Sequence, residues 1–201
     1  MTSGELPRIA CRFFEEEQDW EQIEATYLKD TVTGAKPEQA TWFKIAWTQR
    51  ELCVLFYASD TDAHATMTAR DAPLYEEEVV ELILDPVGDF ESYFEFEVNP
   101  LNGVCDLVLR RTKSGYRKSF EWNCEGLRTA VNVNPEFWLA EMAIPFASLG
   151  SIIPEAGSAW RANFTRIDRP QNAPRELSAW SPTFRPNFHV QQRFGWIDFV
   201  R

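Results

Sequence analysis

The stretch SYFEFEVN, from Ser92 to Asn99, decides the fold class of this chain. Its odd-numbered positions from 93 to 97 carry Tyr, Glu and Glu, whereas its even-numbered positions from 94 to 98 carry Phe, Phe and Val. Successive side chains of a β-strand point to opposite faces of the sheet. The stretch therefore predicts a strand with one apolar face, which packs in a core, and one acidic face, which meets water or a ligand.

Similar runs occur on both sides of this stretch. We expect further strands at residues 41–48, 52–59, 77–85, 104–110, 127–133, 137–144, 160–167 and 196–200. Turn signals such as Asn102-Gly103 and Asn134-Pro135 separate them,. This spacing predicts an all-β fold, a two-sheet antiparallel β-sandwich of the immunoglobulin or jelly-roll kind with little helix. The best helix candidates are residues 15–26 and a single turn at residues 146–149.

The length and composition fit one such domain. The chain has 201 residues, without a repeat, a low-complexity segment or a linker, so we expect a single domain over residues 1–201,. It contains 8 Trp, 15 Phe and 5 Tyr residues. Aromatic residues favour strands, and their flat apolar faces can also stack on a sugar ring.

The formal net charge of −11 limits the classes of partner. A negative field repels phosphate backbones and anionic membranes, so nucleic acid is not an expected partner. A neutral saccharide or a cation such as calcium is compatible with this charge. No run approaches the roughly 18 apolar residues of a membrane span.

The N-terminus and the cysteines indicate in which cellular compartment the protein is expected. Residues 1–12 contain no apolar stretch of a signal peptide, which predicts a cytoplasmic protein, or a secreted one if a signal has been removed,. The four cysteines, Cys11, Cys53, Cys105 and Cys124, form no CxxC pair and do not have zinc-site spacing,. We expect free buried thiols rather than disulfides.

Several segments together resemble the family 9 carbohydrate-binding modules and the wider DOMON-type sandwich superfamily. They are LYEEEVVELILDP (74–86), YFEFEVNP (93–100), FWLAEMAIPFASLG (137–150), WRANFTRID (160–168), SAWSP (178–182) and HVQQRFGWIDF (189–199). Each segment alone is a weak signal, and their order and spacing are more specific. The resemblance implies an antiparallel sandwich that binds a saccharide, often the end of a chain, between two aromatic rings. It also implies calcium ions that brace loops away from the ligand.

The resemblance places two aromatic residues and a carboxylate in the sugar site. Tyr75 matches the first aromatic position, where the better-known sugar binders have Trp, and Glu81 follows six residues later. Trp180 matches the second aromatic position. Each has a structural alternative: Tyr75 can flank a turn, Glu81 can form a salt bridge with an arginine, and Trp180 can belong to the core.

Three further residues are candidates for holding sugar hydroxyls. Arg166 and Asn163 can donate hydrogen bonds to hydroxyl and ring oxygens. They have opposite parity on one predicted strand, so a regular strand does not place them on one face, and Arg166 is the preferred candidate. His189 follows Trp180 in the chain and can lie on the rim of the site.

Metal and catalytic signals are weaker. Asp60 and Asp62 form a DxD pair at the end of a predicted strand, where oxygen ligands suit structural calcium,. The sequence contains only two histidines and no GxSxG, HExxH, P-loop or GxGxxG motif,. We therefore expect no catalytic residues and no enzyme activity.

Two other functions stay open. Some relatives of this sandwich hold a b-type haem between Met and His, and Met67 or Met142 with His64 or His189 would be the candidates here. A structural or interaction module without sugar binding is the other alternative.

Overall fold

A computed structural model describes residues 5–150, 152–171 and 173–201 of the chain. Its strands are β1 (Arg8–Phe13), β2 (Thr26–Tyr27), β3 (Lys29–Asp30), β4 (Thr41–Trp47), β5 (Glu51–Ser59), β6 (Val79–Asp85), β7 (Ser92–Val98), β8 (Val104–Thr112), β9 (Gly115–Ser119), β10 (Arg128–Val133), β11 (Phe137–Pro145), β12 (Ala159–Asp168), β13 (Glu176–Ala179) and β14 (Gly195–Val200). The strand stretches expected from the sequence are all present within two residues at either end. The sequence did not predict β1, β2, β3, β9 or β13.

Helix is limited to short 3-10 turns in the described residues. These are η1 (Trp20–Gln22), η2 (Leu74–Glu76), η3 (Phe146–Ser148) and η4 (Gln191–Arg193). The helix candidate at residues 15–26 contains only η1, in which Asp19 caps the first turn through a 3.0 Å bond from the backbone N–H of Glu21. The turn expected near residue 146 is η3. The prediction of an all-β fold with little helix is confirmed.

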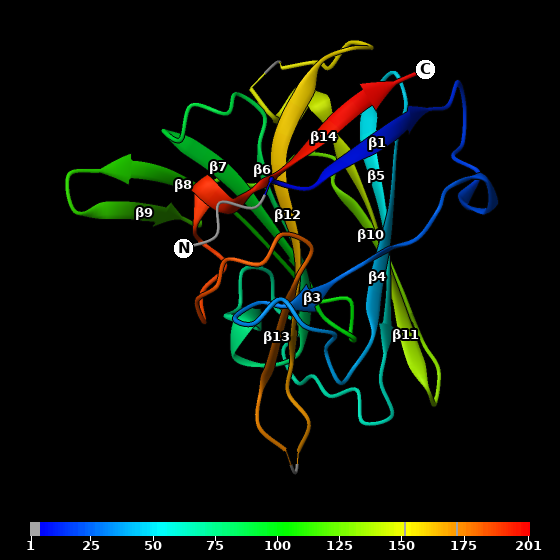
Figure 1. The fold of residues 1–201 in the computed structure, drawn as a ribbon, viewed down its shortest axis with the longest axis vertical. Coiled ribbons are helices and arrows are strands. Elements are labelled where there is room, and N and C mark those ends of the chain that lie inside the picture. Colours follow the sequence, from blue (N-terminus) through cyan, green and yellow to red (C-terminus); the bar gives the residue numbers. More distant parts are fainter. Residues whose placement is uncertain (1–4, 151, 172) are drawn as a thin grey trace.

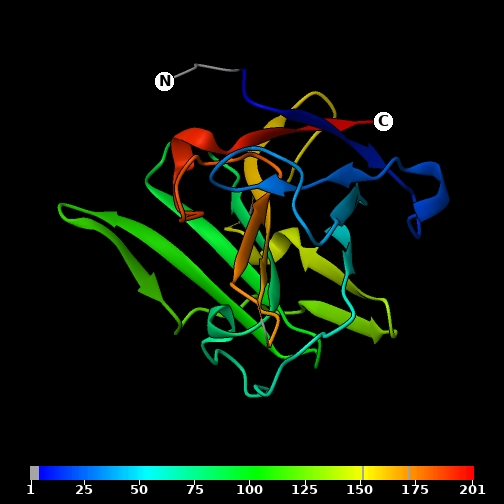
Figure 2. The same cartoon turned by 60° about the horizontal axis from the view of Figure 1, so that its bottom comes forward.

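The strands follow one hydrogen-bonded path that curls into two facing halves, as Figures 1 and 2 show. The order along the path is β10-β11-β5-β4-β1-β14-β12-β6-β7-β8-β9, and the short strands β2, β3 and β13 branch from it. Most pairs are antiparallel, as predicted for a sandwich. β1 differs because it pairs in parallel with both β14 and β4, and it thereby joins the two halves. A parallel pair needs a long connection, and β1 and β14 lie at opposite ends of the chain.

The main core lies between the two halves and is rich in aromatic side chains. Phe43 of β4 and Phe164 of β12 stack across the halves with ring centroids 3.7 Å apart. Trp180 meets both rings edge-on, with centroids 5.8 and 5.7 Å away. Close packing of this kind is the main source of folding free energy.

A second apolar cluster lies on the other face of β12, β6, β7 and β8. It contains Ile83, Tyr93, Leu107, Phe188 and Phe194. The segment from β13 to η4 covers this face with the last two residues of that set. Of the two environments expected for the acidic face of β7, water or a ligand, bulk water is excluded, because Glu95 is 2% exposed and Glu97 is fully buried.

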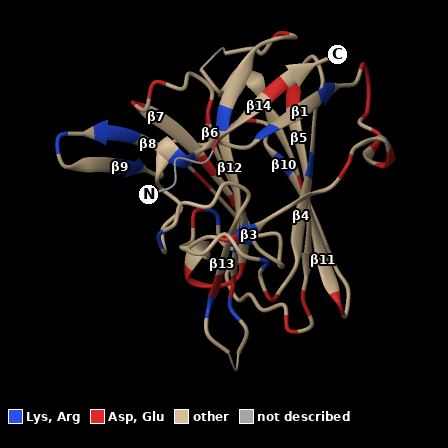
Figure 3. Cartoon of the chain, viewed as in Figure 1, with Lys and Arg blue, Asp and Glu red and all other residues tan. Residues whose placement is uncertain are grey.

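The β8–β9 hairpin extends away from the body of the molecule (Figure 1). Figure 3 shows that basic residues gather along it in a protein that is acidic overall. They are Arg110, Arg111, Lys113, Arg117 and Lys118. No helix in the described part of the chain is long and apolar enough to cross a membrane.

The cysteines agree with the sequence prediction. Cys11, Cys53, Cys105 and Cys124 are all buried free thiols. Burial raises the pKa of the Cys53 thiol to about 12, so it stays protonated and unreactive at neutral pH.

Candidate functional site

A small pocket lies where the covering segment meets the outer face of β6 and β7. Its volume is about 140 Å³. It brings together Tyr75, Glu81 and His189, three of the residues that the sequence put forward for ligand binding. The other lining residues are Glu95, Lys118, Ile167, Arg175, Leu177, Pro186, Asn187 and Phe188.

Glu81 forms the floor of the pocket. It lies in the middle of β6, opposite Thr165 of β12 on one side and Glu97 of β7 on the other. The Thr165 hydroxyl donates a 2.7 Å hydrogen bond to its Oε2. Burial, reinforced by the neighbouring Glu95, raises the pKa of Glu81. The sequence alternative of a salt bridge between Glu81 and an arginine is not what the structure shows, because its bonded partner is this threonine.

The walls carry the remaining polar groups. The Tyr93 hydroxyl and His189 Nδ1 are 3.0 Å apart, and His189 Nε2 lies 3.7 Å from Glu95 Oε1. Burial lowers the pKa of His189, against the opposing effect of Glu95, so its imidazole is neutral near pH 7,. Lys118 Nζ lies 3.8 Å from Glu95 Oε2 and 5.0 Å from the centre of the Tyr75 ring.

Tyr75 is the exposed ring of the pocket. It lies in η2, directly after Pro73, and 37% of its surface is exposed. The turn places it at the mouth of the pocket, whereas Leu74 of the same turn is fully buried and anchors it. Tyr75 therefore both flanks a turn and presents an aromatic surface to a ligand.

A larger cavity adjoins this pocket. Its volume is about 610 Å³, and Arg175, Leu177 and Pro186 line both spaces. Pockets of about 300–1,000 Å³ are typical of small-molecule sites. The shared residues place the two spaces side by side, and we call the pair the groove.

Trp180 and Asn163 lie elsewhere. Trp180 is 5% exposed and packs in the main core, so the structure does not place it across a cleft from Tyr75. Asn163 is fully buried, and its side chain exchanges two hydrogen bonds with the backbone of Ser181, at 3.0 and 2.9 Å. Both residues stabilise the segment that follows β13, which is the core role weighed for Trp180.

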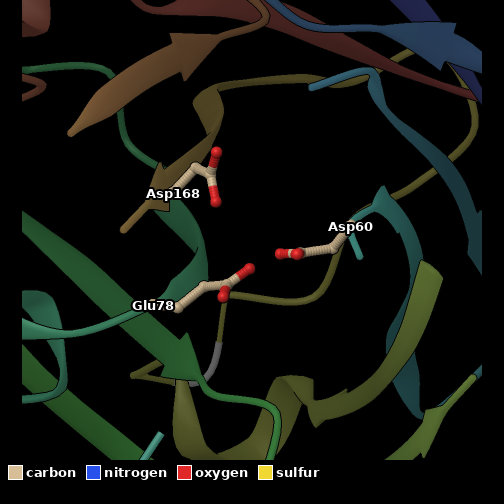
Figure 4. Close-up of side chains that lie close together, drawn as sticks. All are labelled: Asp60, Glu78 and Asp168. Atoms are coloured by element: carbon tan, nitrogen blue, oxygen red, sulfur yellow. The ribbon is translucent and has the colours of Figure 1, made fainter. Parts of the chain in front are cut away.

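Arg166 lies in a buried ion cluster on the core side of β12. Its Nη2 contacts Asp60 Oδ2 at 2.6 Å, Glu78 Oε1 at 2.7 Å and Asp168 Oδ1 at 3.2 Å. Figure 4 shows these three carboxylates pointing toward one another. Burial raises the pKa of Glu78, although Arg166 opposes that shift. Arg166 and Asn163 thus point to opposite faces of β12, as their parity predicts.

The position of Arg166 in this cluster determines whether Asp60 and Asp62 can bind calcium together. The guanidinium of Arg166 already occupies the centre of the three carboxylates that include Asp60. Asp62 is exposed and lies outside that group; one of its oxygens accepts a 3.1 Å bond from the backbone N–H of Gln171. These residues do not fit a shared calcium ion, and we derive no role for calcium from them.

The four candidates for haem ligation lie in different parts of the fold, and one of the pairs is clearly separated. Met142 is buried in the main core, whereas His189 lines the pocket on the other face of the β6–β7 sheet. Met67 packs against the second cluster, and the backbone N–H of His64 donates to Glu78 in the ion cluster. A Met142–His189 pair therefore does not share a site.

The sequence did not single out Glu95, Lys118 or Arg175 as site residues. A sequence feature could have identified Glu95 as a site residue, because it belongs to the acidic face of the strand at residues 92–98. Lys118 and Arg175 had none: they come from a hairpin and a loop whose positions depend on distant parts of the chain.

Comparison with known proteins is consistent with this architecture. The model of the family described as "Carbohydrate-binding family 9" matches residues 14–199. The chain belongs to carbohydrate-binding family 9. Among curated protein sequences, none matches this chain significantly.

Solved structures resemble this family 9 chain over nearly its whole length. A candidate carbohydrate-binding protein from Bacteroides uniformis is 18% identical, with a TM-score of 0.81 over 97% of this chain and 100% of that one. A family 9 module from Caldicellulosiruptor kristjanssonii in complex with cellotriose is 17% identical, with a TM-score of 0.71 over 96% and 94%. Its structure with glucose gives 19% identity and a TM-score of 0.67 over 97% of both chains. At these identities the likeness shows the fold.

Proposed function

We propose that this family 9 chain is a non-catalytic carbohydrate-binding module and that its sugar site is the pocket around Tyr75, Glu81 and His189. The observation that carries this proposal is the convergence of one exposed ring and several hydrogen-bonding groups in a single hollow. Membership of a carbohydrate-binding family supports it, as do the cellotriose and glucose bound to related modules.

The lining groups match the chemistry of a pyranose. The C–H groups on one face of the sugar pack against an aromatic plane, which Tyr75 offers. Neighbouring sugar hydroxyls donate to the carboxylate oxygens of Glu81 and Glu95, while Lys118 and Arg175 donate to hydroxyl and ring oxygens. The neutral His189 can accept or donate through Nε2.

The shape of the groove favours the end of a saccharide chain. The pocket of about 140 Å³ has room for part of one sugar ring. The adjoining cavity of about 610 Å³ can hold the residues that follow. Arg175 lines both spaces, so it can contact two successive sugars.

Isothermal titration with glucose, cellotriose and other short oligosaccharides tests the proposal, guided by a glycan array to choose the ligand. We expect saturable binding that weakens when Tyr75 is replaced by Ala or Glu81 by Gln. Tyr27→Ala is the matched control, because Tyr27 is 60% exposed and does not line the groove.

Three results decide the proposal. Binding that is weakened or lost in both pocket variants and unchanged in Tyr27→Ala supports it. Binding that all three variants retain places the sugar site elsewhere on the sandwich. If the array shows no bound glycan at all, the chain is an interaction module without sugar binding.

A further inference from the structure

We propose that Glu81, Glu95 and Glu97 form a calcium site directly beneath the pocket. All three lie on the same face of the central strands: Glu81 on β6, and Glu95 and Glu97 on β7. Glu81 and Glu97 are paired in register across the two strands, and Glu95 follows at the next position on that face,. None of the three is more than 2% exposed.

The distances between these carboxylates suit one calcium ion. One oxygen from each residue lies within 4.8 Å of the other two. Three atoms no farther apart than that share a centre within about 2.8 Å of each, close to the calcium–oxygen distance of about 2.3–2.6 Å. Calcium takes six to eight oxygens and accepts carboxylates through one or both of their oxygens.

Three of the oxygens in this cluster make no hydrogen bond with the described residues. Neither oxygen of Glu97 makes a hydrogen bond, and Oε2 of Glu95 makes none either. Buried carboxylate oxygens are normally satisfied by hydrogen bonds, because leaving them without a partner costs free energy. Glu97 is fully buried and aimed at the two other carboxylates, so it needs a ligand that the protein itself does not supply.

That ligand is small and positively charged. Glu97 is not among the residues that line the pocket, so a sugar hydroxyl does not reach it. Lys118 is the nearest ammonium, but it is 3.8 Å from Glu95 and its side chain is 35% exposed. When all three carboxyls are ionised, Lys118 alone leaves two negative charges uncompensated, and a divalent cation balances them.

The second buried carboxylate cluster provides an internal comparison. Asp60, Glu78 and Asp168 also lie within 4.8 Å of one another. There the protein supplies its own cation, since Arg166 contacts all three carboxylates. No described arginine or lysine enters the Glu81–Glu95–Glu97 cluster in this way, which is the difference that points to an external cation.

The proton is the competitor of calcium at this site. Burial raises the pKa of Glu97, and the neighbouring Glu81 and Glu95 raise it further, against the positive charge of Lys118. The raised pKa favours the protonated form of Glu97. Calcium competes with that proton, so its binding releases protons and tightens as the pH rises.

The inference deepens the proposed function without depending on it. Glu81 and Glu95 both line the sugar pocket and would both contact the ion. A bound calcium would hold their carboxylates in one geometry and order the pocket floor. Calcium binding is measured without sugar, and sugar binding with and without calcium, so that either proposal can fail alone.

The experiment begins with protein stripped by EDTA and dialysed. Calorimetric titration with calcium chloride, then magnesium chloride, is run at pH 7.5 in two buffers of different ionisation enthalpy. We expect one calcium per chain, proton release, and a weaker response to magnesium, which demands octahedral geometry and keeps its waters. At a calcium concentration about 100 times Kd, the Tm should rise by about 5–10 °C.

Two variants and one control locate the ion. Glu97→Gln keeps the shape and removes the charge, and it should abolish calcium binding and the rise in Tm. Glu95→Gln should weaken binding at least tenfold, and it serves as the test if Glu97→Gln does not fold. Glu141→Gln, at an exposed position on β11, should behave like the unaltered protein.

The outcomes separate the two proposals. No calcium binding up to millimolar concentration in the unaltered protein overturns the cation site and leaves the sugar site standing. Calcium binding that survives in Glu97→Gln and Glu95→Gln also overturns it, because the ion then lies elsewhere. Calcium binding without any sugar binding supports the cation site and removes the proposed function.

Discussion

The indole ring of Trp180 lies directly against the backbone of Gly195. A Cβ atom built on Gly195 would stand 2.5 Å from Cζ3 and 2.6 Å from Cη2 of that ring. Gly195 begins β14, and Trp180 follows β13, so this contact fixes the last strand against the segment that covers the second cluster. The glycine is needed for the close approach, because any other residue would displace the ring.

Trp180→Ala should destabilise the fold rather than act on the ligand alone. The ring is 5% exposed and packs against Phe43 and Phe164. Truncating a buried Trp costs about 3–5 kcal/mol. Chemical denaturation measures this loss, and an unchanged free energy of unfolding together with lost sugar binding would instead place Trp180 in the site.

Gly195→Ala should destabilise by overpacking at the same contact. The added methyl group meets Trp180 and also the carbonyl oxygen of Pro7 at 2.8 Å. Overpacking of this kind typically costs about 1–3 kcal/mol. Gly150→Ala is not an equivalent control, because Gly150 has a φ of 76° and its substitution would strain the backbone. Gly103→Ala is the closer comparison, because a Cβ atom on Gly103 would also meet a backbone oxygen, at 2.7 Å. Equal stability of Gly195→Ala and the unaltered protein would contradict the contact.

Arg166→Met should be among the most destabilising single changes. It leaves three buried carboxylates, those of Asp60, Glu78 and Asp168, without their shared cation. Removing one partner of a buried ion pair costs about 3–5 kcal/mol. The exposed pair of Arg111 and Glu91 gives the control, since Arg111→Ala should cost less than about 1 kcal/mol,. Similar free energies of unfolding for both variants would show that the cluster contributes no more than a surface pair.

The two pocket substitutions should weaken sugar binding by different routes. Tyr75→Ala removes an aromatic contact worth about 1–3 kcal/mol, which corresponds to an affinity about 5- to 100-fold lower. Glu81→Gln keeps the shape and loses the ionised acceptor, worth about 1.5–3 kcal/mol, so the affinities are compared above the Glu81 pKa of about 8. The Tm of Tyr75→Ala should change little, because its ring is 37% exposed. A large fall in Tm without a change in affinity would make Tyr75 a structural residue.

The stability of the calcium-free protein should depend on the protonation of Glu81 between about pH 4 and pH 8,. Burial raises the pKa of Glu81 to about 8, whereas its unfolded value is about 4.3. The folded state thus holds a proton that the unfolded state releases, so this stabilisation is complete below about pH 4 and is lost as the pH rises through about 8. Gln mimics the protonated acid at every pH. In EDTA, the Tm of Glu81→Gln minus the Tm of the unaltered protein should therefore increase between pH 6 and pH 9. A Tm difference that stays constant with pH would contradict the raised pKa.

The alternation of SYFEFEVN predicted both a strand and its two faces, because side-chain direction in a strand depends only on local geometry. What that pattern could not provide was the environment of the acidic face. His189 lies 3.7 Å from Glu95, some 90 positions earlier in the chain, and Phe188 and Phe194 belong to the apolar cluster on the same face. An acidic face is normally solvated, and packing against parts of the chain that are distant in sequence buries these carboxylates.

The candidate site shows the same division. The sequence selected Tyr75, Glu81 and His189, which the structure brings into one pocket. It also selected Trp180 and Arg166, which lie elsewhere. A Trp can stack on a sugar or pack in a core, and an Arg can bind a sugar hydroxyl or form a buried ion cluster. Burial distinguishes these uses, and burial is a property of the packed chain.

The sequence by itself determined the all-β class, most strand positions, the free thiols and the resemblance to carbohydrate-binding family 9, since these depend on local periodicity and on motif order. Only the tertiary structure decided that Lys118 and Arg175 reach the pocket, that Arg166 neutralises one cluster of three carboxylates, and that Glu81, Glu95 and Glu97 form another without such a partner. The physical reason is that contacts between distant strands are fixed by sheet register and by the folding of the covering segment over β6 and β7, neither of which is encoded within any one stretch of residues.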